Sequence, residues 1–118
     1  MTKMTKLIIS LALVFTAPLA LACDYPAPPK DLPDGATATK DEMLAGVKLI
    51  SEYQESMTEY LSCIEADQAA ALQALGDEDE EAKTRSSENF DKRYNAAVDE
   101  QTKTVEIFNL EIRSYKAQ

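Results

Sequence analysis

Residues 39–75 read TKDEMLAGVKLISEYQESMTEYLSCIEADQAAALQAL, and this stretch decides the fold. Along it, residues suited to a helix interface recur at alternating steps of four and three, the a/d spacing of a coiled-coil seam. Thr39 and Glu42 have the spacing of a capping box, which marks a helix start. We therefore expect one long helix over residues 39–75. Its seam consists of Met43, Val47, Ile50, Gln54, Met57, Leu61 and Ile64, continued by Gln68, Ala71 and Leu75.

A second stripe on the same helix lies one residue before each step of the seam. It combines a glycine, two aromatic rings and a cysteine at helical spacing. We expect it to pack against the segment that precedes the helix. The stripe consists of Gly46, Leu49, Tyr53, Ser56, Tyr60 and Cys63.

The preceding segment, residues 23–38, holds four prolines and the turn-forming pair Asp34-Gly35, so it should be an extended arm without a helix. At about 3.1 Å per residue, the arm from Cys23 to Gly35 spans about 37 Å. The helix from Asp41 to Cys63 spans about 33 Å at 1.5 Å per residue. An arm that reverses near residues 35–37 therefore reaches Cys63. The alternative is a flexible tether that leaves the tyrosines in solvent.

A second helix is expected over residues 79–116, where apolar residues again alternate at steps of four and three. Gly76 is a suitable C-cap for the first helix, and the acidic residues 77–81 supply an N-cap and a negative first turn for the second. Because the connection is short, the helices should be antiparallel neighbours. The second seam consists of Tyr94, Val98, Gln101, Val105, Phe108, Ile112 and Tyr115, with Phe90 and Ala97 beside it.

These elements predict an all-α fold: an antiparallel two-helix hairpin over residues 39–118, similar to a coiled coil, with the proline-rich arm packed on the first helix. Alignment about the turn places Met57 near Val98 and Ile50 near Val105. Gln54 then falls beside Gln101, where a buried amide pair would fix the register. Two hydrated amides that do not pair are the alternative.

Residues 1–22 have the features of a signal peptide. Lys3 and Lys6 precede an apolar segment too short to span a bilayer, and Ala20-Leu21-Ala22 offers a small-residue cleavage site. Loss of the two lysines would take the formal charge from −9 to −11. Such an acidic chain is expected to be soluble and is a poor ligand for nucleic acid or an anionic membrane. The mature chain should contain no membrane span.

The two cysteines are expected to pair, because export leads to an oxidising compartment. We predict a Cys23–Cys63 disulfide in a periplasmic protein. The alternative is a lipoprotein anchored through Cys23, which directly follows the cleavage site. Ala20 and Leu21 fit a lipobox poorly, and lipidation would leave Cys63 as a free thiol.

The composition gives little support for catalysis. There is no histidine and no tryptophan, and only three glycines, so the commonest general base and a glycine-rich phosphate loop are missing. The acidic residues 77–81 with Glu88 approximate calcium-ligand spacing, but Ala82 stands where the sharp turn requires glycine. Glu52, Glu55 and Glu59 should lie on a solvated helix face. We expect no enzymatic activity, no metal and no cofactor.

Several short blocks resemble a family of small uncharacterised exported proteins of Gram-negative bacteria. This resemblance implies export and a helical hairpin, and no established activity. Within the blocks, Asn95, Asp99 and Asn109 are not seam residues, so they are candidates for capping the arm's backbone or for a partner surface. The blocks are Cys23 with the following prolines, residues 33–37 (PDGAT), 42–43 (EM), 60–63 (YLSC), 94–99 (YNAAVD) and 108–109 (FN), then Arg113 and Tyr115.

Three functional hypotheses follow from these features. The first is a non-enzymatic structural or interaction protein, because two helices and an arm leave apolar surface for an unknown protein partner or for self-association. The second is a holdase-like chaperone or adaptor of the periplasm. The third is an envelope protein anchored by a lipid on Cys23.

Overall fold

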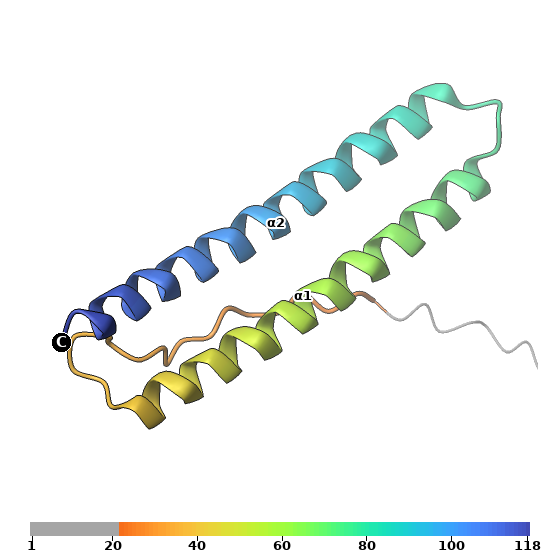
Figure 1. Cartoon of the computed structure of the whole chain (residues 1–118). Coiled ribbons are helices and arrows are strands. Elements are labelled where there is room, and N and C mark those ends of the chain that lie inside the picture. The colour runs from red at the N-terminus through yellow and green to blue at the C-terminus, as the bar shows by residue number, and fades with distance from the viewer. Residues whose placement is uncertain (1–21) are drawn as a thin grey trace, which may run out of the picture.

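The computed structural model describes residues 22–118 as two long antiparallel helices with an extended N-terminal arm (Figure 1). Helix α1 covers Lys40–Leu75 and helix α2 covers Glu80–Lys116, and the described residues form no strand. The predicted all-α hairpin is therefore confirmed. The predicted signal peptide lies outside the described residues, except for Ala22. Within the described part of the chain, neither helix is long and apolar enough to cross a membrane.

Local capping explains where the helices begin and end. The Thr39 hydroxyl accepts a hydrogen bond from the Glu42 amide at 3.3 Å, and the Glu42 carboxylate accepts one from the Thr39 amide at 2.7 Å. These bonds hold the pKa of Glu42 below its usual range. Gly76 ends α1 with a φ of 64°, a conformation that favours glycine. Asp79 starts α2 by accepting a hydrogen bond from the Ala82 amide at 3.0 Å.

The buried face of α1 is rotated toward the arm relative to the predicted seam. Every third or fourth residue is buried, but the set mixes the two stripes. Val47, expected in the seam, is instead 49% exposed. Gln54 and Leu61 are only half-buried. The buried residues of α1 are Met43, Gly46, Ile50, Tyr53, Met57, Tyr60 and Ile64.

Helix α2 shows the same rotation. Only Phe108 of the predicted seam is buried, together with Ala97 and Thr104. The remaining seam residues are half-buried, and Thr104 was missed because a threonine does not stand out in an apolar pattern. The physical reason is common to both helices: the arm covers one flank of the hairpin and leaves the other flank open. The half-buried residues are Tyr94, Val98, Gln101, Val105, Ile112 and Tyr115.

The core consists of two clusters along the hairpin. The first is centred on Met57 and Ile64, which are 0% and 1% exposed, and joins Cys23 of the arm to α1 and α2. The second is centred on Phe108 and joins Leu32 and Ala38 to both helices. Gln54 and Gln101, expected to form a buried amide pair, are joined by no side-chain hydrogen bond within residues 22–118. The register is therefore supported by the apolar clusters.

Candidate functional site

The arm runs back from its turn along the hairpin, and the C-terminus lies beside the turn (Figure 1). The Ala38 amide donates to the Asp34 carbonyl at 2.8 Å, which closes the turn. The Gly35 amide donates to the Glu111 carboxylate of α2 at 2.7 Å, and the Gln118 side-chain amide donates to the Gly35 carbonyl. The arm was expected to pack on the first helix, and in the structure Glu111 of α2 and the C-terminal residue Gln118 also hold it.

Two glycines allow the close approach of the arm to the helices. A Cβ atom at Gly35 would lie 1.8 Å from the Glu111 carbonyl oxygen. One at Gly46 would lie 2.7 Å from Pro33 Cδ and 2.8 Å from Phe108 Cε2. Both positions therefore require glycine for packing. Leu49, also expected to face the arm, lines a hollow with Pro33 but is itself 36% exposed.

Tyrosines hold the other half of the arm. Tyr25 packs edge to face on Tyr60, with ring centroids 4.9 Å apart and an interplanar angle of 77°. The Tyr25 hydroxyl donates to Glu100 of α2, and burial together with this carboxylate raises the pKa of Tyr25. Tyr53 is buried, and although its hydroxyl lies near Thr104, no hydrogen bond of ordinary geometry satisfies it among the described residues.

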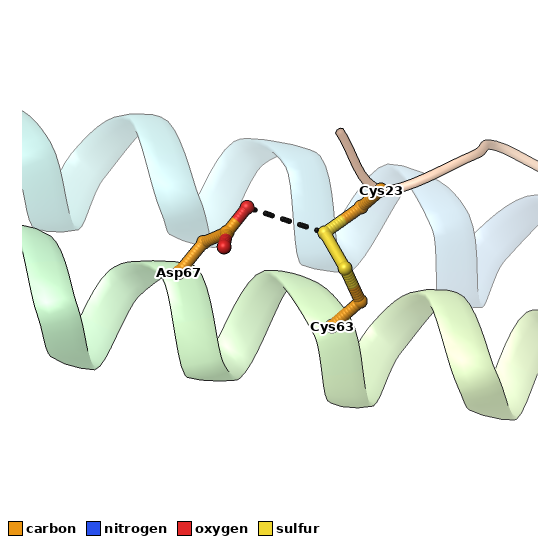
Figure 2. The surroundings of a disulfide bond; sticks show 3 residues. All are labelled: Cys23, Cys63 and Asp67. Atoms are coloured by element: carbon orange, nitrogen blue, oxygen red, sulfur yellow. Dashed lines mark hydrogen bonds between the residues drawn. A yellow bond between two sulfur atoms is a disulfide. The ribbon is translucent and has the colours of Figure 1, made fainter. Parts of the chain in front are cut away.

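The arm is fastened by the disulfide between Cys23 and Cys63, whose Cα atoms are 5.7 Å apart (Figure 2). The predicted pairing is thus present, and both cysteines are half-buried. Asp67, one helical turn after Cys63, places its carboxylate oxygen 3.2 Å from the Cys23 sulfur. A disulfide sulfur has no proton to donate, so this contact becomes a thiol-to-carboxylate hydrogen bond only after reduction. Sequence reasoning missed Asp67, although its i+4 spacing from Cys63 was a signal.

The two asparagines and the aspartate that were candidates for capping the arm make no hydrogen bond to it within the described residues. Asn95, Asp99 and Asn109 are exposed, and the arm is instead hydrogen-bonded by Glu100 and Glu111 of α2 and by the C-terminal residue Gln118. The arm is therefore held by long side chains that carry no sequence signal of their own. The carboxylates Glu52, Glu55 and Glu59 are also exposed, as expected for a solvated face.

The Asp67 carboxylate should protect the disulfide from reduction by thiols. It opposes both the approach of an anionic thiolate and the growth of negative charge on the Cys23 sulfur. At this distance a screened charge is worth about 1 kcal/mol, so Asp67→Asn should be reduced about fivefold faster by glutathione. Free-thiol release with time measures the rate. Glu65→Gln, which removes an exposed carboxylate nearby in the sequence, is the control and should reduce like the wild type; equal rates for all three proteins would contradict the prediction.

Comparison of the chain with protein-family models, with curated proteins and with solved structures finds no match. The resemblance to small exported proteins therefore stays a prediction.

Proposed function

We propose that the protein is a non-enzymatic structural protein of the periplasm that self-associates through the hairpin face opposite to the arm. The support is the partly exposed apolar row that the rotated packing leaves on that face. Val47 is 49% and Leu44 56% exposed there, and the other members are half-buried. We call this row the open face; it consists of Leu44, Val47, Leu61, Val98, Val105 and Ile112.

The position of the open face follows from helical spacing. On α1, the arm-side residues Gly46, Tyr53 and Tyr60 flank one side of the central row that contains Ile50 and Met57, so Val47 and Leu61 flank the other. On α2, the side chains that bind the arm are Glu100 and Glu111. Val98, Val105 and Ile112 lie on the opposite flank. Apolar side chains of both helices thus meet on the side that the arm leaves open.

Charge favours a second copy of the chain as the occupant of the open face. The chain is strongly acidic, with a formal charge of −9, yet the exposed residues that border the middle of the open face are neutral, and charged residues of both signs, such as Lys48 and Glu65, lie toward its ends. Two copies can therefore meet along this middle part without bringing carboxylates together, whereas the arm side presents Glu100 and Glu111. A self-complementary pairing of this kind gives a symmetric dimer. The neutral border residues are Ser51, Thr58, Asn95, Thr102 and Asn109.

Light scattering over a concentration series tests this proposal. The wild type should form a dimer, and Val47→Glu should raise its Kd about tenfold or more, because the charge would be buried without a partner. Leu110→Glu is the matched control, since Leu110 is 55% exposed and helical spacing places it on the outer face of α2, away from the open face. A monomer at all concentrations would overturn self-association.

The same samples distinguish the alternative functions. Suppression of client aggregation by a monomeric protein, lost in Val47→Glu, would replace self-association with a holdase activity. A lipid on Cys23 would require the sulfur atom that the disulfide uses. The intact mass of the protein isolated from the cell envelope therefore distinguishes the lipid-anchored form from the disulfide-bonded form.

A further inference from the structure

Beyond self-association, we infer that the reduced protein binds a zinc-like divalent cation through Cys23, Cys63 and Asp67. The two sulfur atoms and a carboxylate oxygen of Asp67 all lie within 4.8 Å of one another. Thiolate and carboxylate ligands suit Zn²⁺, which holds neighbouring ligand atoms of a tetrahedral site about 3.5–3.8 Å apart. The Asp67 carboxylate is therefore near coordinating distance of the Cys23 sulfur, and the two bonded sulfur atoms have to separate after reduction to reach the same spacing.

The local structure favours this ligand set. Cys63 and Asp67 are one helical turn apart on α1, so the helix itself holds them on one face, the arrangement used by paired ligands in helical zinc sites. Cys23 comes from the extended arm, which allows its sulfur to move away from Cys63 once the S–S bond is broken. Asp67 is exposed and the cysteines are half-buried, so a water molecule has access to a fourth position.

The geometry leaves room for a cation beside the carboxylate. The Asp67 carboxylate lies 3.2 Å from the Cys23 sulfur, so the two groups already face each other. A divalent cation deprotonates a coordinating thiol outright. The occupied site would therefore surround the cation with three anionic ligands.

The chemical steps balance as follows. Two equivalents of a thiol reductant reduce the S–S bond to the thiols of Cys23 and Cys63 and are themselves oxidised to a disulfide. Binding of Zn²⁺ then replaces the two thiol protons, which are released to solvent. The cation restores the link between the arm and α1 that reduction removed. The link between the arm and α1 thus has two forms, a covalent bond when the cysteines are oxidised and a metal bridge when they are reduced.

Cobalt(II) titration of the full chain tests the inference, since thiolate-to-cobalt charge transfer absorbs in the near ultraviolet. The protein is reduced with a phosphine, which becomes the phosphine oxide. We expect one equivalent of Co²⁺ to give the charge-transfer band, Zn²⁺ to displace it and two protons to be released per Zn²⁺. The oxidised protein should give no band. Absence of the band after reduction would overturn the inference.

Asp67→Asn separates this site from binding by the two thiols alone. The variant keeps the disulfide and so folds before reduction. Loss of the carboxylate should weaken Zn²⁺ binding about tenfold or more, since even outer-shell changes cost 10- to 100-fold. Glu65→Gln is the control and should bind like the wild type. Equal affinity in Asp67→Asn and the wild type would remove Asp67 from the site and refute the three-ligand proposal.

Discussion

Replacement of both cysteines by serine is expected to lower the free energy of unfolding by about 4 kcal/mol. The disulfide joins residues separated by 40 positions, so its loss restores the freedom of a long loop in the unfolded chain. The same change frees the end of the arm, where the remaining contacts are those of Tyr25 with Tyr60 and Glu100. Chemical denaturation followed by circular dichroism measures the stability. Reduced wild-type protein in a metal-free buffer should show the same loss.

Proteolysis of the arm checks that the lost stability comes from this element. Lys30 is exposed in the middle of the arm, and trypsin should cut there faster in the double serine variant. The helices supply the control, because their lysines and arginines should be cut only as fast as global unfolding allows. Unchanged stability together with unchanged cleavage at Lys30 would show that the arm is held without the disulfide.

Local sequence signals were sufficient to predict the two helices and where they begin and end. The capping box of Thr39 and Glu42, the glycine at position 76 and the cap at Asp79 depend on neighbours in sequence. The a/d spacing likewise required only that each helix present an apolar row to the other. The pairing of Cys23 with Cys63 could be expected because the chain offers no other cysteine.

The second stripe was expected to pack against the arm, but the exposure of the seam residue Val47 could not be obtained from the same signals. Gly46 and Val47 lie on opposite flanks of the same row, and periodicity alone favours the valine. The structure buries the glycine because Pro33 and Phe108 pack against it, and both are distant in sequence. The binding of the arm by Glu111 is equally nonlocal, since it depends on how the finished hairpin places an ordinary surface residue. Contacts between residues distant in sequence therefore determine which flank of α1 is buried, and the apolar pattern alone does not.

Met57→Ala is expected to destabilise the protein by about 2–5 kcal/mol. Met57 is 0% exposed and packs in the cluster with Tyr53, Tyr60 and Ala97, so its truncation removes buried contacts from both helices and leaves a cavity. The sequence pattern alone would assign a similar cost to Val47→Ala, because both residues belong to the predicted seam. The structure assigns that change a much smaller cost, within about 0.5 kcal/mol, since Val47 is 49% exposed.

Chemical denaturation of both variants compares the two accounts, at a protein concentration where the wild type is monomeric. That condition matters because Val47 belongs to the open face, and a dimer would add an association term to its apparent stability. A large loss for Met57→Ala with little change for Val47→Ala would support a buried face rotated toward the arm. Equal losses would instead place both side chains in one symmetric seam, and the arm could not then be what buries one flank of the hairpin.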